Sequence, residues 1–248
     1  MIKVSKIKKS FSDTVVLDGV SFDVKEGEAI SIIGKSGIGK SVLLKHLNGL
    51  MRPDSGSVSI DNRLINRMDF YQIEKIRAQI SMVFQFGALF DSMTVGENIA
   101  LGLKKMTELN GVEIKDRISE TLEEVGMEGS EKKYPAELSG GMKKRVGIAR
   151  AIAVRPKYIL YDEPTTGLDP VMTDSINKLI SKLHTLENVT SIIVTHDMRT
   201  VYEVTDRVLM IHEGKIIFDD LSEKIKKSED VVVRNFIQGI SDKEFYKN

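Results

Sequence analysis

Eight consecutive residues form a segment that we call the phosphate loop, because its composition suits binding to a phosphate chain. They read, in order, Gly34, Lys35, Ser36, Gly37, Ile38, Gly39, Lys40 and Ser41, and they match the pattern G-x-x-x-x-G-K-[ST]. In this pattern glycines let backbone N–H groups wrap around phosphate oxygens, the lysine neutralises the β- and γ-phosphates, and the final hydroxyl can ligate Mg²⁺. The segment therefore predicts a nucleoside triphosphate site, with Lys40 on the phosphates and Ser41 on the metal.

The sequence around the phosphate loop agrees with this prediction. The apolar run 29–33 precedes it, and apolar residues at 42–44 and 47 follow at helical spacing, up to Asn48 and Gly49. A strand, a glycine loop and then a helix is the context that the motif requires, and the helix N-terminus adds a positive dipole. The alternative, an accidental glycine-rich turn, does not account for this order.

Two adjacent carboxylates, Asp162 and Glu163, follow the apolar run 158–161. A carboxylate at the end of a buried strand can complete the magnesium site of a phosphate loop, and we expect Asp162 to take this role. A second carboxylate beside the γ-phosphate can orient and deprotonate the attacking water, which makes Glu163 the candidate general base. The alternative is that Asp-Glu-Pro only forms a solvated turn after the strand.

A second glycine-rich segment, 138–142, contains Ser139, Gly140 and Gly141 and precedes a helical pattern over 143–152. Free N–H groups and a hydroxyl at a helix N-terminus can bind an anion. Because the phosphate loop already takes the phosphates of the nucleotide, the expected ligand is the phosphate of another molecule. The alternative is a plain N-cap, and the basic run 143–145 is interpreted as a solvated helix face.

Composition restricts the class of protein. The 248 residues suffice for one large α/β domain or two small ones, and 41% hydrophobic with 29% charged residues indicates a globular chain. Lys plus Arg and Asp plus Glu both number 36, so no net charge favours nucleic acid. No segment approaches the roughly 20 apolar residues that cross a bilayer. There is also no signal-peptide core and no Cys, so we expect a cytoplasmic protein.

Hydrophobic periodicity predicts the order of elements. Residues 20–24 alternate as in a half-buried strand, and 69–126 is mainly helical around a strand at 79–84. The apolar runs 158–161 and 191–195 each follow a helical segment, which is typical of a parallel sheet buried on both faces. A hairpin is expected over 208–218 with its turn at Glu213 and Gly214. The predicted fold class is therefore α/β with a mainly parallel sheet.

Taken together, the order and spacing of these motifs resemble the ABC ATPases over roughly residues 2–220. The resemblance implies further site residues: Gln85 in the glutamine loop touching Mg²⁺ and water, Asp169 in the D-loop, His196 as the switch, and Phe11 stacking on adenine. Each alone is a weak signal, because a histidine after a strand and a phenylalanine in one are usually packing residues. One departure is Met142, where many members carry Gln.

The resemblance also implies the architecture and the partners. It implies a P-loop NTPase core, an antiparallel β-subdomain at the N-terminal side and a helical subdomain at about 86–153, within an ATPase domain 1–227 followed by a helical tail 228–248. ATP and Mg²⁺ are the implied cofactors. A second copy would share the two ATP molecules, because the segment 138–142 resembles the LSGG signature of the family and the signature segment of each copy would meet the γ-phosphate held by the other. Transmembrane permease subunits would hold the chain at the inner face of the cell membrane, and no nucleic acid is expected.

Two segments resemble a particular subfamily, the ATPases of MCE-associated (Mla-type) phospholipid transport systems. These are 84–95, Phe-Gln-Phe-Gly-Ala-Leu-Phe-Asp-Ser-Met-Thr-Val, and 236–240, Phe-Ile-Gln-Gly-Ile. The resemblance implies lipid transport, MCE-type partners and a docking role for 86–95, which receives the coupling helix of the membrane subunit in this family. Alternatively, 86–95 is simply core.

Other functions fit less well. A soluble ABC ATPase that drives assembly, for example of iron–sulfur clusters, could have an identical ATP site. A GTPase should carry Asn-Lys-x-Asp, but Asn177-Lys178 leads into Leu179-Ile180. A small-molecule kinase would not need 138–142, and translation or DNA-repair members usually hold two ATPase halves or long coiled-coil inserts.

The C-terminal segment carries one more pattern. Val233, Phe236, Ile237 and Ile240 recur at spacings of three and four, as in a helix with one apolar stripe. This stripe either folds back on its own domain or reaches the second copy or a regulatory partner, and the latter would also account for Phe245 and Tyr246 near the end.

Overall fold

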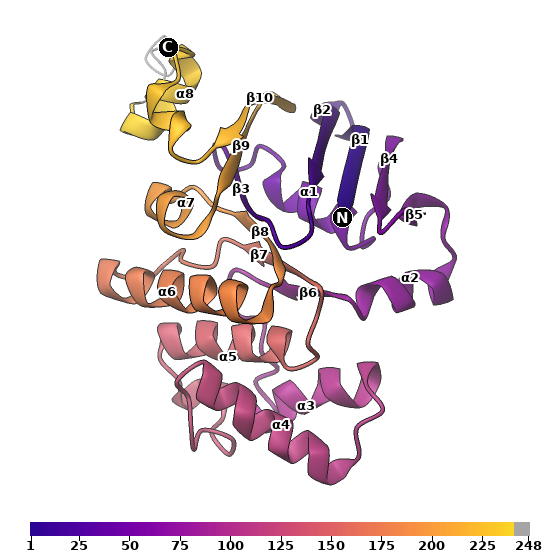
Figure 1. Ribbon diagram of the computed structural model, residues 1–248, viewed down its shortest axis with the longest axis vertical. Coiled ribbons are helices and arrows are strands. Elements are labelled where there is room, and N and C mark those ends of the chain that lie inside the picture. The colour runs from indigo at the N-terminus through magenta and orange to yellow at the C-terminus, as the bar shows by residue number, and fades with distance from the viewer. Residues whose placement is uncertain (241–248) are drawn as a thin grey trace. The chain divides into compact units, whose positions relative to one another are not determined.

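The structure is a computed structural model that describes residues 1–240 (Figure 1). It consists of two compact units. The first comprises Met1–Met68 and the described residues from Ile193 onward, and the second comprises Asp69–Ile192. Within the described residues, no helix combines the length and the apolar character needed to span a membrane.

The first unit contains an antiparallel sheet with the strand order β2 (Thr14–Val24), β1 (Ile2–Phe11), β4 (Ser55–Ile60) and β5 (Arg63–Leu64). The predicted alternation is confirmed, because Val20, Phe22 and Val24 of β2 are buried while the residues between them are exposed. This is the antiparallel layer expected at the N-terminal side.

A second sheet in the first unit positions the phosphate loop. Its strand order is β10 (Lys215–Leu221), β9 (Arg207–His212), β3 (Ala29–Ile33) and β8 (Thr190–Val194), the strand in which the chain passes from the second unit to the first. β3 is entirely buried and runs parallel to β9, and β9 pairs antiparallel with β10. The hairpin turn lies at Glu213 and Gly214, at φ 47° and 74°, as predicted. After β3 come the phosphate loop and α1 (Lys40–Leu47).

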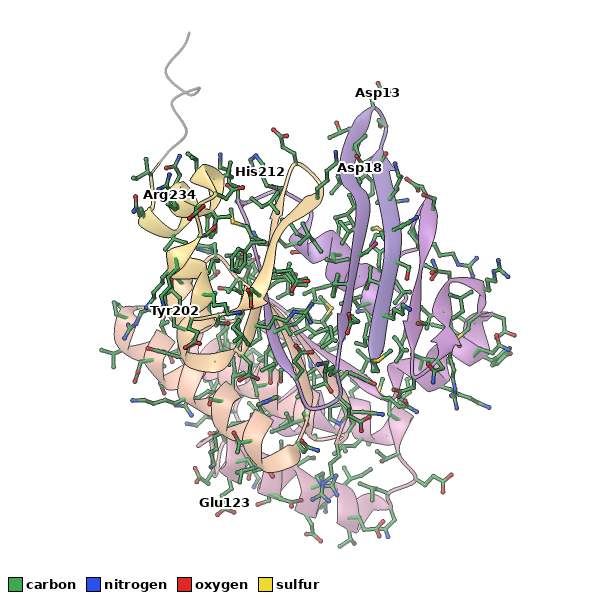
Figure 2. The ribbon with its side chains drawn as sticks, turned by 45° about the horizontal axis from the view of Figure 1, so that its top comes forward. Asp13, Asp18, Glu123, Tyr202, His212 and Arg234 are labelled. Atoms are coloured by element: carbon green, nitrogen blue, oxygen red, sulfur yellow. The ribbon has the colours of Figure 1, made fainter. Side chains whose placement is uncertain are left out.

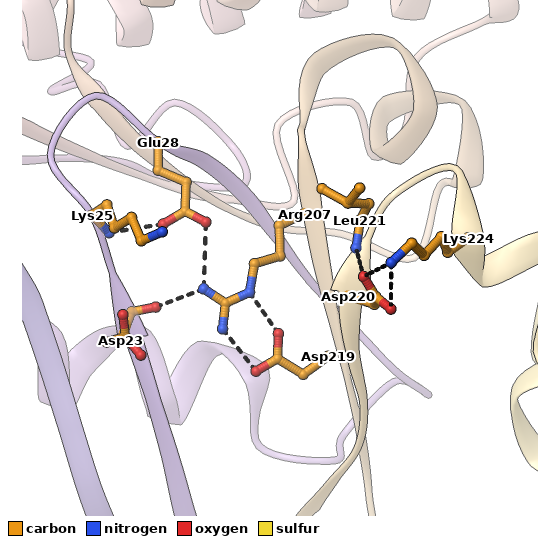
Figure 3. A network of polar contacts seen from close by, with 8 residues as sticks. All are labelled: Asp23, Lys25, Glu28, Arg207, Asp219, Asp220, Leu221 and Lys224. Atoms are coloured by element: carbon orange, nitrogen blue, oxygen red, sulfur yellow. Dashed lines mark hydrogen bonds and ion pairs between the residues drawn. The ribbon is translucent and has the colours of Figure 1, made fainter.

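An arginine on β9 fastens the strands around β3 (Figure 3). The Arg207 guanidinium donates to both carboxylate oxygens of Asp219 on β10, at 2.6 and 2.8 Å, and to Glu28 Oε1 at 3.3 Å. It also donates to the main-chain oxygen of Asp23 at 3.0 Å. Hydrogen bonding to Asp219 raises the pKa of Arg207 above its usual value, so the guanidinium stays charged. One side chain thus joins β9, β10, the end of β2 and the residue that precedes β3.

The C-terminal helix packs on this sheet. The short helix η3 (Lys224–Lys227) leads to α8 (Val231–Gln238), whose Val233 is fully buried in a cluster of Ile33, Val201, Val208, Met210 and Ile225. Phe236 and Ile237 pack against the same cluster, whereas Arg234 is exposed at the surface (Figure 2). Most of the predicted apolar stripe therefore folds back on its own unit. Ile240 is exposed, and Phe245 and Tyr246 lie outside the described residues.

Truncation after Lys227 is therefore expected to destabilise the protein. The deletion uncovers the cluster that contains Ile33, the last residue of β3, and burial of one valine and parts of Phe236 and Ile237 corresponds to about 3 kcal/mol. Urea unfolding measures the loss, and truncation after Ile240 is the control. ATP affinity at low temperature should persist. Unchanged stability together with failed assembly into a complex would show instead that the tail serves a partner.

The second unit combines two parallel strands with a group of helices. β6 (Ile80–Val83) pairs with β7 (Tyr158–Asp162), with Ile80 opposite Tyr158, and the strand order is β8, β7, β6. The other helices are α2 (Phe70–Arg77), α3 (Val95–Met106), α4 (Gly111–Glu124), α5 (Gly140–Ile152) and α6 (Pro170–Glu187), with η2 (Pro135–Glu137) before α5. α5 packs against α3, α4, α6 and β6.

Local sequence explains where these helices begin. Asp69, Thr94 and Asn110 each form a capping box with a Gln or Glu three residues later, which satisfies N–H groups at the helix start. The strand β6 confirms the predicted strand at 79–84, and the helices α2, α3 and α4 confirm the helical segments predicted around it. The α/β fold class is confirmed as well, with its mainly parallel and antiparallel sheets and a group of helices.

Candidate active site

The phosphate loop has the backbone of an anion cradle. Gly37 and Gly39 have φ values of 78° and 102°, a region that glycine adopts without strain. A Cβ on Gly37 would meet nothing within 4 Å, so a ligand can approach the backbone there, whereas one on Gly39 would lie 2.4 Å from Val16 Cγ1. Gly39 is also the N-cap of α1 and offers no side-chain acceptor to the first turn. An anion suits this position.

Lys40 lies inside the curve of the loop and is 5% exposed. Its ammonium group donates to the main-chain oxygens of Gly34 at 2.8 Å and Lys35 at 3.0 Å. These bonds hold the charge within the cradle, where β- and γ-phosphates bind in loops of this type. The chemistry predicted for Lys40 therefore fits its surroundings.

The hairpin of β1 and β2 presents apolar side chains to solvent in the same unit. Phe11 is 44% exposed and Val15 is 59% exposed, and the next residue, Val16, packs against Gly39 of the phosphate loop. The reading of Phe11 as a core residue is therefore wrong. Phe11 is on β1, and its hairpin partner β2 is the strand that contacts the phosphate loop. An exposed aromatic ring on this hairpin is suited to stack on a nucleobase.

His196 lies in the first unit too. It is exposed and follows β8, where the main-chain N–H of Thr195 donates to Ile32 O at 3.2 Å. Asp197 caps α7 (Met198–Val204) by accepting from Arg199 N. His196 therefore stands after the strand next to β3, at the edge where β3 leads into the phosphate loop, and it is not a buried packing residue.

In the second unit, Asp162 ends β7 and Glu163 follows it with φ 50°. A positive φ is unusual for a residue other than glycine and is maintained only where the surroundings enforce it. The Thr166 hydroxyl donates to Glu163 Oε2 at 3.0 Å and orients the carboxylate. Both carboxylates thus lie at the carboxyl end of a parallel strand, where ligands bind in such sheets.

Gln85 follows β6, the parallel neighbour of β7, so the structure brings Gln85 to the same edge as Asp162 and Glu163. It lies in the turn 84–88, which we call the glutamine loop. The Gly87 N–H donates to Phe84 O at 2.9 Å and closes this turn.

The glutamine loop is fastened to α5. The Lys144 ammonium donates to Gln85 O and, at 3.2 Å, to Glu163 O, and the Arg150 guanidinium donates to Gly87 O at 2.9 Å and Ala88 O at 2.7 Å. Lys144 is 5% exposed, and this burial lowers its pKa to about 8. The interpretation of 143–145 as a solvated face is therefore wrong for Lys144. It is also wrong for Arg145, which donates to Ser175 Oγ and Val125 O.

The segment 138–142 begins α5. The N-cap is Ser139, whose Oγ accepts from Met142 N at 3.3 Å. Ser139 and Gly140 are exposed, while a Cβ on Gly141 would lie 2.1 Å from Met172 Cε. Met172 N in turn donates to Asp169, the N-cap of α6. The structure thus brings the signature and D-loop residues together within the second unit and leaves the helix start open to another molecule.

A family model described as ABC transporter matches residues 17–166, which include the phosphate loop, the segment 138–142 and Glu163. The chain belongs to the ABC transporter family. It is an ATP-binding cassette of this family and hydrolyses ATP.

Relatives of this ABC cassette carry names that point to different functions. The methionine import ATP-binding protein MetN 2 of Listeria monocytogenes is 36% identical over 98% of this chain and 73% of the relative. The protein TRIGALACTOSYLDIACYLGLYCEROL 3 of Arabidopsis thaliana is 36% identical over 98% and 74%. The probable ribonucleotide transport ATP-binding protein mkl of Mycobacterium leprae is 40% identical over 96% and 69%.

Solved structures of ABC cassettes share the fold. The cassette MJ0796, solved as a post-hydrolysis dimer bound to ADP and Pi, superposes with a TM-score of 0.83 at 33% identity, covering 90% of this chain and 99% of MJ0796. The cassette cbiO1 of Clostridium perfringens, part of the transporter complex cbiONQ, gives 0.83 at 33%, covering 96% and 94%. The ABC ATPase fold is thereby confirmed.

Three residues that hold the loops of this ABC site in place, namely Val16, Lys144 and Arg150, were not predicted from the sequence. A signal existed for Lys144. It lies three residues after Gly141 and four before Ile148, both buried, so it shares the packed face of α5.

Proposed function

We propose that this chain is the motor subunit of a membrane transporter, in which two copies close on two ATP molecules and reopen after hydrolysis. The observation that carries the proposal is the exposed start of α5 at Ser139 and Gly140, where N–H groups at a helix N-terminus could bind an anion in addition to the one at the phosphate loop. The dimeric state of MJ0796 with ADP and Pi supports it. Ser139, Gly140 and Gly141 of one copy would meet the γ-phosphate held by the other, with Asp169 close by.

Within one copy, the proposed roles follow from side-chain chemistry. Lys40 binds the β- and γ-phosphates and Phe11 stacks on adenine. Glu163 takes the proton of the attacking water, with its carboxylate oriented by Thr166, and His196 contacts the γ-phosphate as the switch.

The donors proposed for Mg²⁺ are Ser41, Asp162 and Gln85. A hydroxyl, a carboxylate and an amide oxygen are hard ligands, which fits the preference of this ion. When bound, Mg²⁺ neutralises the charge that develops on the phosphates.

A groove in the second unit supports docking to a permease. It has a volume of about 410 Å³ and is lined mainly by apolar side chains of β6, the glutamine loop, α3 and α5, together with Phe90 from the turn before α3. Phe84, Leu101 and Met106 are among them. Phe90 is 52% exposed, so the reading of 86–95 as simple core does not hold for it. We propose that a coupling helix of the membrane subunit binds here, in the manner of a helix in a groove. The chain would then be peripheral at the inner face of the membrane.

The docking groove is built in advance. Asn98 of α3, fully buried, accepts from Phe90 N at 2.8 Å and donates to the main-chain oxygens of Phe90, Met93 and Thr94. These bonds fix the turn before α3, and Phe90 with it. A preformed groove loses little conformational entropy when a partner binds.

For the cargo we propose phospholipid or another lipid, which would be transported together with MCE-type partners. The helical subdomain at about 86–153 would couple this subunit to the membrane complex without touching the cargo. The segment 84–95 supports this, and the Arabidopsis relative bears the name of a galactolipid. Methionine is the second candidate, because the Listeria relative is named as a methionine importer. No observation favours the iron–sulfur assembly alternative.

Purification of the tagged chain from membranes tests both the role as a transporter subunit and the lipid cargo. We expect multi-span membrane proteins, an MCE-domain protein and excess phospholipid to co-purify. Phe90→Glu places a charge in the groove and should reduce co-purification at least about tenfold, while Phe70→Glu, at an aromatic residue on α2 that is 65% exposed, should have no effect. A complex without lipid or MCE protein whose ATPase responds to methionine would favour the second candidate. Equal recovery with Phe90→Glu would exclude the groove.

A further inference from the structure

Lys144 holds an unusual position in α5. Its ammonium group donates to the main-chain oxygens of Gln85 and Glu163, two residues that follow neighbouring strands and are far apart in the sequence. The side chain is 5% exposed. The same two residues are the proposed metal-side amide and the proposed general base, so one buried cation joins the backbones of two catalytic groups.

An apolar packing residue could not make these contacts, because it has no N–H donor. Burial of an ammonium group is unfavourable unless its donors find acceptors, and here two carbonyl oxygens accept from it. At Glu163 the bond acts on a residue whose φ of 50° needs support from its surroundings. Fixing the Glu163 carbonyl fixes the direction in which its side chain leaves the backbone, and Thr166 then orients the carboxylate.

The rest of the glutamine loop is attached to the same helix. A Cβ on Gly147 would lie 3.1 Å from Gly87 Cα, and one on Gly87 would lie 2.9 Å from Lys143 O. Arg150 holds the carbonyls of Gly87 and Ala88. A displacement of this loop, which also lines the docking groove, must therefore pull on α5 and on Lys144.

We propose that Lys144 is a positioning residue that ties the glutamine loop to Glu163, so that the loop and the general base move together. The inference rests on the proposed roles of Gln85 and Glu163.

The test compares Lys144→Met, which keeps the buried stem but removes the donors, with Lys144→Arg, which retains them. Lys143→Met, a half-exposed neighbour on the same helix, is the matched control. In the full-length chain, Lys144→Met should lower kcat at least about tenfold with KM for ATP and ATP affinity within twofold, since the base and the glutamine loop lose the side chain that positions them whereas the phosphate loop is unchanged. Lys144→Arg should recover kcat to within about threefold, and Lys143→Met should match the wild type.

Hydrogen exchange supplies a readout apart from activity. In Lys144→Met, the amides of 84–88 and 163–166 should exchange faster, while those of β3 and α1 remain as in the wild type. Wild-type kcat in Lys144→Met would overturn the inference. So would a parallel fall of ATP affinity, melting temperature and kcat, because that would show a role in building the domain. If Glu163→Gln is inactive and Lys144→Met is active, only this inference fails; if Glu163→Gln is active, the proposed base itself is wrong.

Discussion

Glu163→Gln is expected to retain ATP binding and lose turnover. The amide has the size of the carboxylate, and its oxygen can still accept from the Thr166 hydroxyl, which lies 3.0 Å from Glu163 Oε2. It cannot take a proton from water, so kcat should fall by about 10²- to 10⁴-fold. Steady-state hydrolysis and equilibrium binding of ATP, measured on the same preparation, separate the two effects. Glu123→Gln, an exposed carboxylate on α4 (Figure 2), is the control.

The contrasting variant, Lys40→Ala, is expected to lose ATP binding itself. The ammonium group lies within the phosphate loop, bonded to Gly34 O and Lys35 O, and its removal deletes the charge that meets the β- and γ-phosphates. Lys45→Ala, an exposed lysine on α1, should bind ATP normally. Hydrolysis by Glu163→Gln within a few-fold of wild type would refute the assignment of the base, and wild-type affinity in Lys40→Ala would refute the phosphate site.

Ser139→Arg is expected to reduce hydrolysis at least about 100-fold although it leaves the phosphate loop and Glu163 of its own copy intact. A large cation at the exposed start of α5 fills the place where the second copy would present its γ-phosphate, and one lost stabilising contact of this kind costs about 10²-fold or more. ATP affinity of the isolated subunit should stay within about threefold. The same change at an exposed serine of α4, Ser119→Arg, should leave hydrolysis unchanged. Full activity in Ser139→Arg would mean that each copy hydrolyses ATP alone.

Much of the fold could be predicted because the signals are local. The glycines, the lysine and the following apolar residues specify β3, the phosphate loop and α1 within one short stretch. The hairpin of β9 and β10 is predicted by a turn at Glu213 and Gly214, residues that adopt positive φ. The site residues at strand ends follow from the same logic, since parallel strands place their carboxyl ends at one edge.

What could not be predicted depends on contacts between distant segments. Lys144 looked like part of a basic surface run, because nothing near it in the sequence shows that the carbonyls of Gln85 and Glu163 would lie around its ammonium group. The apolar stripe of α8 left open whether it would cover its own sheet or a partner, and only the position of Val233 against Ile33 and Met210 favours the former. Val16 likewise acquires its contact with Gly39 only when the hairpin folds.

Sedimentation velocity of Glu163→Gln tests most directly whether two copies share their ATP sites. Without nucleotide, the chain should sediment as a monomer of 27.8 kDa. With saturating ATP and Mg²⁺ it should shift to a species of twice that mass, and adding Ser139→Arg to the same chain should abolish the shift without abolishing ATP binding. A Glu163→Gln protein that binds ATP yet sediments identically with and without it would contradict the shared-site mechanism.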